Sequence, residues 1–224
     1  MPYSAGVFFL AMKLKPPKII RHLFPSLIWE IDDPEGVFLT FDDGPTPGIT
    51  EWILAMLEKY DAKATFFVLG KNVEAYPDLF RRIVDAGHKV GNHTYSHQKG
   101  WGMSLERYIE DVDFANDLIH SELFRPPYAR ITPAQARALS QRYKLVMWHI
   151  ISRDYNRRLS PRTCLKNVCF PMELAGVKKA EAEKDQAGFE KWCELMLDQA
   201  ALADQGTVKD PARFVKLMNE LLLK

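Results

Sequence analysis

The sequence predicts an α/β protein built on a parallel sheet or barrel. Between residues 37 and 151, short apolar runs rich in β-prone residues alternate with segments of helical periodicity, which is typical of such folds. Charged and polar residues gather where the predicted strands end. The 224 residues include 13 Phe and 5 Trp, and 47% of the chain is hydrophobic, so one domain with a sizeable core is expected.

The predicted elements follow one another in a regular order. Four apolar runs have the length and composition of buried strands: residues 37–41, 64–70, 88–93 and 143–151. Four segments with hydrophobic residues three and four apart are predicted helices: residues 50–60, 77–86, 104–120 and 133–141. We therefore expect the ends of several parallel strands to meet at one edge, where barrels of this kind carry their chemistry.

Three parts of the chain are distinguished by composition. Residues 1–35 are predicted to be an N-terminal arm, punctuated by prolines from residue 12 onward. Residues 36–168 hold the alternating elements and are the predicted domain. Residues 169–224 form an atypical helical C-terminal segment, with a mixed charge run and two amphipathic stripes that indicate packing faces.

Charge and cysteine content exclude several classes of function. Lys and Arg number 30 against 29 Asp and Glu, so the net charge of +1 does not favour a nucleic-acid partner. The three cysteines show no CxxC pattern and are interpreted as free thiols.

The apolar patch of residues 1–11 is too short for a membrane span and lacks the basic leader of a signal peptide. A cytoplasmic location is the default expectation, with a cell-envelope substrate still possible.

The pairs Asp42–Asp43 and His93/His97 predict a metal site. A catalytic zinc takes three protein ligands and leaves a fourth position for water, and a spare carboxylate can act as the base for that water. Asp42 and Asp43 alternate along a strand, but a turn at Gly44 would let Asp43 reach a metal while Asp42 stays beside the water. Taken alone, Asp-Asp-Gly-Pro is more simply an ordinary turn.

The two histidines are spaced i, i+4, which predicts one face of a helical turn, although two histidines in a polar loop can also be incidental. Arg125 precedes two prolines that stiffen its loop, and its guanidinium is predicted to hold a carboxylate bidentately. The alternative for Arg125 is a surface arginine. Tyr128 is expected either to offer a backbone N–H to an oxyanion or simply to pack.

Residues 36–168 resemble the polysaccharide deacetylase family, the NodB-homology domain of carbohydrate esterase family four. The resemblance rests on Thr-Phe-Asp-Asp-Gly at 40–44, His-Thr-Tyr-Ser-His at 93–97 and Arg-Pro-Pro-Tyr at 125–128, in the family's order. Two strand segments also have the amino-acid sequence that is usual at these places in the family: residues 64–67 and 87–93.

The resemblance implies a distorted (β/α) barrel and hydrolysis of the amide (carbon–nitrogen, not peptide) bond of an N-acetylated sugar, or of an O-acetyl ester, in a polymer or oligomer. By matching position, three residues would hold a divalent metal, typically zinc: Asp43, His93 and His97. Asp42 would be the general base, and Arg125 would orient it. The backbone N–H of Tyr128 would bind the oxyanion. The expected partner is an acetylated carbohydrate.

One family feature is missing. The family has a late strand ending in Leu-His whose histidine protonates the leaving amine, but this chain has no histidine after His149. Three explanations compete: a divergent tail supplies another acid, the acid is lost, or the reading frame shifts after about residue 168. His149 is the first candidate for a substitute acid, with a supporting role equally open. The alternative function is therefore a catalytically weakened or inactive carbohydrate-binding relative.

Overall fold

The computed structural model describes residues 21–22, 24–31, 38–156, 158–160, 163–164 and 167. These residues fall into two compact units. The first contains the described residues from Arg21 to Met147, and the second contains those from Trp148 onward. All strands and helices named below belong to the first unit.

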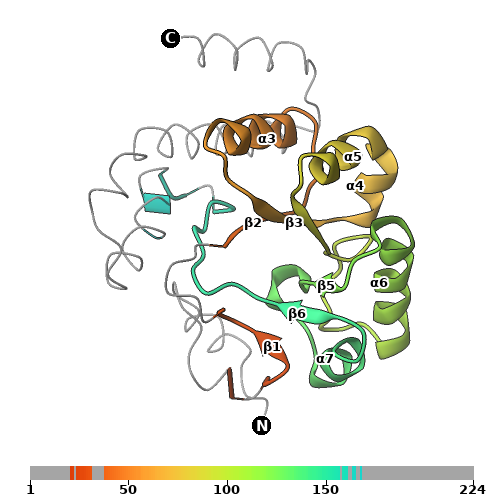
Figure 1. The fold of residues 1–224 in the computed structure, drawn as a ribbon. Helices are drawn as coiled ribbons and strands as arrows, with labels where there is room; N and C mark the ends of the chain where they lie inside the picture. Colours follow the sequence, from red (N-terminus) through yellow and green to blue (C-terminus); the bar gives the residue numbers. More distant parts are fainter. Residues whose placement is uncertain are drawn as a thin grey trace. The chain divides into compact units, whose positions relative to one another are not determined.

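The first unit is built on a six-stranded parallel sheet in the order β1-β6-β5-β4-β3-β2 (Figure 1). Its strands are short: β1 (Leu27–Ile28), β2 (Leu39–Asp42), β3 (Ala64–Val68), β4 (Lys89–Asn92), β5 (Leu123–Phe124) and β6 (Lys144–Val146). The sheet curves into an open half barrel, with β1 and β2 at its two edges. Because every pairing is parallel, the carboxyl ends of all six strands lie at the same end of the sheet.

The core lies where the central strands meet the helices. Phe67, Val68, Phe124 and Leu145 are fully buried in the sheet. β3 and β4 can approach closely because Gly91 lies opposite Phe67, and a Cβ at Gly91 would stand only 2.4 Å from the Phe67 ring. Glycine at this position therefore leaves the space that the aromatic ring fills.

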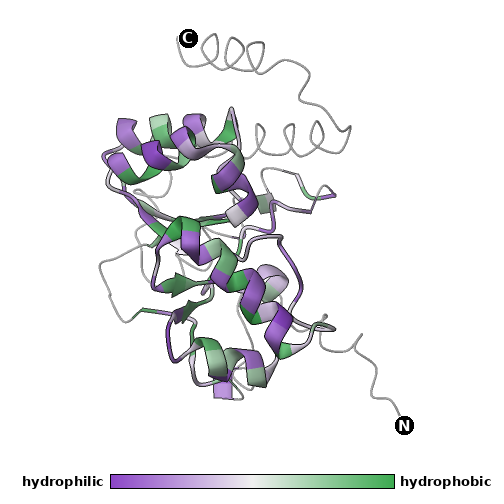
Figure 2. Cartoon of the chain, turned by 90° about the vertical axis from the view of Figure 1, so that its right-hand side faces the viewer, coloured by the Kyte–Doolittle hydropathy of each residue, from purple (hydrophilic) through white to green (hydrophobic). Residues whose placement is uncertain are grey.

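The helices connect successive strands and are amphipathic. They are α3 (Ile49–Lys59), α4 (Gly70–Ala75), α5 (Pro77–Asp85), α6 (Leu105–Ile119) and α7 (Pro133–Leu139), with one 3-10 turn at Pro127–Ala129. Figure 2 shows both hydrophobic and hydrophilic residues along them. In α6 the buried residues recur every three or four positions: Tyr108, Val112, Ala115 and Ile119. Ser104 caps this helix by accepting a hydrogen bond from Arg107 N.

The predicted order of strands and helices is confirmed, with differences at short elements. Helix α4 and strand β5 were not predicted, and β6 is shorter than the expected strand. Leu27–Ile28, inside the predicted N-terminal arm, forms β1 and pairs with β6. A strand of two residues is too short to show an alternation of buried and exposed side chains. This strand is therefore identified only by its pairing with β6. The predicted helical segment after residue 168, most of the arm, and Cys169 and Cys193 lie outside the described residues, whereas Cys164 is a buried free thiol.

Within the described part of the chain, we find no helix with the length and apolar character needed to cross a membrane.

Candidate active site

Asp42 and Asp43 stand at the carboxyl end of the edge strand β2. Asp42 is the last residue of the strand, and Asp43 follows with a positive φ of 70°. This left-handed conformation, which aspartate tolerates better than most residues, turns the chain at Asp43 itself rather than at Gly44. The turn is held from both sides, since Asp43 N donates to Phe67 O and Asn72 Nδ2 donates to Asp43 O. The two carboxylates therefore leave the strand in different directions.

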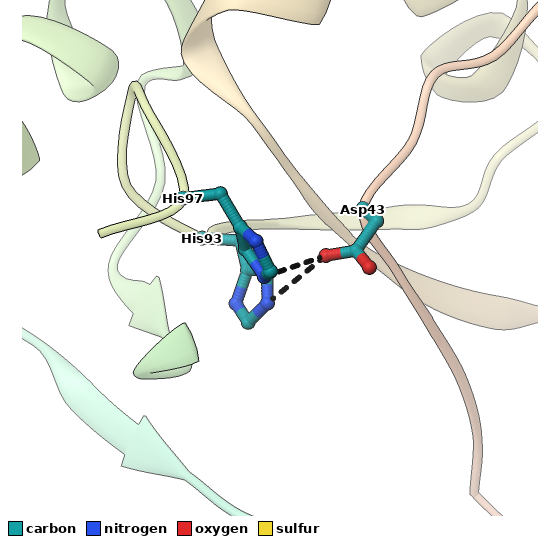
Figure 3. A group of neighbouring side chains, drawn as sticks. All are labelled: Asp43, His93 and His97. Atoms are coloured by element: carbon teal, nitrogen blue, oxygen red, sulfur yellow. Dashed lines mark ion pairs between the residues drawn. The ribbon is translucent and has the colours of Figure 1, made fainter. Parts of the chain in front are cut away.

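His93 and His97 follow β4 in a tight loop, not in the predicted helical turn. Thr94 and His97 have positive φ values of 69° and 60°, which break any helical run. His93 is buried, whereas His97 is partly exposed. The loop brings the Nε2 atoms of both imidazoles to one carboxylate: Asp43 Oδ1 lies 3.4 Å from that of His93 and 3.1 Å from that of His97 (Figure 3).

These three residues offer a donor set suited to a divalent metal. Among the described residues, Asp43, His93 and His97 are the group whose ligand atoms all lie within 4.8 Å of one another. Ligand atoms about 2.0–2.2 Å from a tetrahedral zinc are roughly 3.3–3.6 Å apart, which is close to the 3.4 and 3.1 Å that separate Asp43 Oδ1 from the two Nε2 atoms. Two imidazoles and one carboxylate also suit other first-row divalent metals, so the donor set selects a class of metal rather than one ion.

The protonation of His93 is set by its partner on the other side of the ring. Nδ1 lies 2.7 Å from the carbonyl oxygen of Arg125. Because a carbonyl only accepts, Nδ1 must carry a proton in this contact, and Nε2 is the ring nitrogen that faces Asp43. A backbone carbonyl that orients a ligand imidazole in this way is a usual feature of metal sites.

The carboxyl group of Asp43 is held in its anionic form. Desolvation by itself raises the pKa of Asp43, but hydrogen bonds and charge interactions with His93 and His97 outweigh it and keep the pKa well below its ordinary value. An ionised carboxylate is the form that binds a metal.

Asp42 is paired with the buried arginine of the third motif. Arg125 Nη1 donates to Asp42 Oδ1 at 2.7 Å, and this single hydrogen bond replaces the bidentate pair that the sequence predicted. The rest of the guanidinium is used elsewhere: Nη1 also donates to Thr40 Oγ1, Nε to Val146 O and Nη2 to Met147 O. Its carbon lies 4.0 Å from the centre of the Phe67 ring. Arg125 is thus no surface arginine, and its contacts with three strands fix the position from which it holds Asp42.

Asp111 is a site-supporting residue that the sequence analysis missed. From α6, its Oδ2 accepts hydrogen bonds from the N–H groups of Tyr95 and Ser96, and its Oδ1 accepts one from Ser96 Oγ at 2.6 Å. These residues form the loop between the two histidines. A carboxylate three residues after buried Tyr108 and four before buried Ala115 lies on the apolar side of the helix, and that position was the available signal.

Two buried polar side chains complete the support of the loop. Thr94 Oγ1 accepts from His97 N at 3.0 Å, and Asn92 Oδ1 accepts from Thr94 N at 2.8 Å. Asn92 Nδ2 in turn donates to Val112 O on α6. The N–H groups that a helical turn would have paired internally are satisfied by these side chains, which explains why the loop does not need helical geometry.

Tyr128 lies beside the metal-ligand candidates. Its ring centre is 4.5 Å from that of His97, and its φ of 58° places the peptide in the left-handed region. The oxyanion role of its N–H remains a prediction. His149, the candidate substitute acid, belongs to the second unit of the structure.

Comparison with known proteins identifies the family of this chain. A family model for polysaccharide deacetylase matches residues 31–148, more than half of the sequence. The chain belongs to the polysaccharide deacetylase family. The peptidoglycan-N-acetylglucosamine deacetylase of Bacillus cereus is 37% identical over 139 residues, which cover 59% of this chain and 50% of that protein. The chain therefore spans about half the length of this relative.

Solved structures share the fold. A peptidoglycan N-acetylglucosamine deacetylase in complex with an N-oxidanyl-benzamide superposes with a TM-score of 0.62 at 30% identity, covering 68% of this chain and 74% of that one. A family-four pseudoenzyme from Bacillus anthracis gives 0.60 at 27% identity, covering 65% and 54%. The predicted fold, an α/β distorted barrel of the polysaccharide deacetylase type, is thereby confirmed.

Proposed function

We propose that this chain is a metal-dependent hydrolase that removes acetyl groups from an N-acetylated or O-acetylated carbohydrate. The observation that carries the proposal is the geometry at the strand ends. The possible ligand atoms of Asp43, His93 and His97 lie within 4.8 Å of one another. Asp42, the residue before Asp43, is held by a hydrogen bond from Arg125. The named activities of the relatives, deacetylases of carbohydrate polymers, support this reaction class.

The metal would be held by Asp43, His93 and His97, and zinc is the proposed ion. When bound, it would supply Lewis acidity that lowers the pKa of water and polarises an acetyl carbonyl. The chain's own contribution is to hold the three ligands in place, since Asp43 is ionised and Nε2 of His93 and of His97 both face its carboxylate.

Asp42 is assigned the general base. Its Oδ1 is occupied by Arg125 Nη1, which leaves Oδ2 to take the proton of the attacking water. Arg125 also donates to Thr40 and to two main-chain carbonyls, so it restricts where Asp42 can point. The N–H of Tyr128, in the left-handed turn beside His97, is the proposed donor to the oxyanion.

A second candidate function is carbohydrate binding with weak or no turnover. It is favoured by the sequence itself, which has no histidine after His149 to protonate a leaving amine. A structural neighbour from Bacillus anthracis is named a pseudoenzyme of carbohydrate esterase family four, and this supports the second candidate. Loss of a positioned acid typically costs about 10²–10⁴-fold in rate, so metal and glycan binding would survive it.

The deciding experiment is acetate release by the zinc-loaded full chain. Acetylated chito-oligosaccharides, peptidoglycan fragments and acetylated xylan are the substrates, and Asp42→Asn is compared with the exposed-site control Asp78→Asn. We expect release by the native chain and by Asp78→Asn, and a loss of about 10²–10⁴-fold in Asp42→Asn with metal content unchanged. Glycan binding without release from any substrate would favour the second candidate. Release that persists in Asp42→Asn would refute the assigned base.

A further inference from the structure

Residues 67–72 run from the end of β3 into α4, and β3 lies between the two strands whose ends carry the metal-ligand candidates. On the side of β2, three hydrogen bonds join this segment to the turn that contains Asp43. Asp43 N donates to Phe67 O at 3.1 Å, and Leu69 N donates to Gly44 O at 2.9 Å. The third bond runs from Nδ2 of Asn72 to Asp43 O, at 2.8 Å. The turn is therefore fastened to the chain that continues from β3.

The same segment also holds the loop that carries His93 and His97. Three main-chain hydrogen bonds join them: His93 N to Val68 O at 3.0 Å, Gly70 N to Thr94 O at 3.0 Å, and Lys71 N to Tyr95 O at 3.2 Å. Glycine at position 70 permits this contact, because a Cβ there would stand 2.6 Å from the Tyr95 ring and 2.9 Å from the main chain of Ala115. One continuous segment thus contacts both of the loops that carry the ligand candidates.

Asn72 differs from the rest of this segment because it acts through its side chain. The other five bonds join main-chain groups, and every residue except proline carries both a donor and an acceptor there. The amide of Asn72 reaches a carbonyl that follows a left-handed residue, since Asp43 has a φ of 70°. This conformation costs free energy in a residue other than glycine, so it persists where neighbouring groups hold it. Asn72 holds the carbonyl side of the turn.

The placement of the Asp43 carboxylate depends on this turn. The side chain is 60% exposed, and it approaches the imidazoles of His93 and His97 from the other side of the site (Figure 3). Among the described residues, the contacts of its carboxylate are with these two imidazoles, so support from outside the ligand set comes through the Asp43 main chain. A rotation of that main chain would carry Oδ1 away from both Nε2 atoms.

We propose that Asn72 is a positioning residue for the metal site. Its amide fixes the main chain of Asp43 and thereby keeps the Asp43 carboxylate at the distance from His93 and His97 that one divalent metal requires. This inference rests on the proposed function and deepens it, because it assigns part of the affinity for metal to a residue outside the three sequence motifs. Asn72 acts in this role through Asp43 and is not itself a ligand.

The zinc affinity of the full chain, measured by competition with a chelator of known affinity, tests this role. We expect Asn72→Ala to bind zinc about 10-fold more weakly than the native chain, the lower end of the effect typical of residues that orient a ligand. Asn72→Gln keeps an amide donor and should bind zinc more tightly than Asn72→Ala.

A matched control is Asn116→Ala, which also removes a side-chain hydrogen bond to the main chain. Asn116 Oδ1 accepts from Ser121 N near the carboxyl end of α6, where the chain leads into the amino end of β5. The zinc affinity of this variant should equal that of the native chain. Urea denaturation of each variant checks that it is folded under the conditions of the zinc titration.

A double-mutant cycle separates positioning from a general loss of structure. Asp43→Gly removes the carboxylate but keeps the left-handed turn, which glycine adopts freely. Because Asn72 acts through Asp43, Asn72→Ala should weaken zinc binding in the native background and have no further effect in the Asp43→Gly background.

The outcomes distinguish this role from the proposed function. Unchanged zinc affinity in Asn72→Ala, or an equal loss in the native and Asp43→Gly backgrounds, would overturn the positioning role and leave the three ligand assignments standing. A native chain that binds no zinc would refute the proposed metal and this role together. A loss confined to chains that retain Asp43, without acetate release from any substrate, would support the role and contradict the proposed hydrolysis.

Discussion

The two strand ends that form the site differ in how firmly they are held. After β4, the His93 side chain is only 3% exposed, and the flanking Asn92 and Thr94 are fully buried and hydrogen-bonded. After β2, the side chains of Asp42 and Asp43 are 34% and 60% exposed. The imidazole side of the site is therefore part of the interior, and the carboxylate side faces solvent.

This difference separates two requirements of the site. Ligand imidazoles benefit from a fixed ring orientation, which buried hydrogen bonds provide. A general base must remain accessible to water and substrate. Arg125 joins the two sides, because its carbonyl oxygen accepts from His93 Nδ1 while its guanidinium donates to Asp42. The following predictions test how far the buried side of the site, and the groups that support it, determine metal affinity and stability.

Removal of a ligand imidazole should have the largest effect. We expect His93→Ala and His97→Ala each to lower zinc affinity by more than about 100-fold, since loss of a supporting partner alone typically costs about 10–100-fold. Competition with a chelator of known affinity measures this. The buried His93 should also be needed for stability, whereas His97→Ala should remain folded. Undiminished metal binding in both variants would refute the assigned ligands.

Replacement of Arg125 by lysine should break the link between the two sides. Lysine keeps the charge but cannot donate to Asp42, Val146 O and Met147 O together. Buried carbonyls left without a donor should lower the free energy of unfolding by about 2–4 kcal/mol, measured by urea denaturation. The control Arg142→Lys weakens an exposed pair with Asp113 and should cost at most about 1 kcal/mol. Equal stability losses in the two variants would contradict the role of Arg125.

Asp111 should matter for metal binding although it is not a ligand candidate. We expect Asp111→Ala to lower zinc affinity by about 10–100-fold, because the loop between the histidines loses three hydrogen bonds. Asp113→Ala, on the same helix, should change affinity less than about twofold, as expected for an exposed pair. Asp111→Asn retains an acceptor oxygen, and its zinc affinity should lie between those of Asp111→Ala and Asp113→Ala. If Asp111→Ala and Asp113→Ala bind zinc equally, the loop does not depend on α6.

His88 tests the opposite end of β4 and should give the smallest effect. Burial, helped by the charge of Lys63, lowers the pKa of His88 below its ordinary value, and its Nδ1 accepts from Ala64 N. In the unfolded chain, the His88 imidazole therefore takes up a proton near pH 6.5, whereas in the folded chain it does so only at a lower pH. Stability linked to His88 is full above that pH and is lost as the pH falls below it.

Urea denaturation at pH 8 and pH 5 checks this sign. The native chain should lose more stability between these two values than His88→Gln, which keeps an acceptor but does not titrate. The same loss in both proteins would assign the pH dependence to other groups.

The order of the elements and the residues of the site followed from local patterns. Alternating apolar runs and amphipathic segments predicted the strands and helices, because burial on one face leaves a period in the sequence. The three motifs at 40–44, 93–97 and 125–128 pointed to Asp42, Asp43, His93, His97 and Arg125. Strand β1 and the support from Asp111 were not predictable in this way, since each depends on a partner more than ten residues away.

By itself, the sequence determined the family, the parallel α/β fold and the residue types available for a metal and a base. Only the tertiary structure decided how those residues are arranged: the left-handed turn at Asp43, the proton on Nδ1 of His93, and the single rather than double bond from Arg125 to Asp42. The physical reason is that side-chain composition and period are local properties. Hydrogen-bond partners, in contrast, are assigned when distant strands and helices pack and each buried donor must find an acceptor.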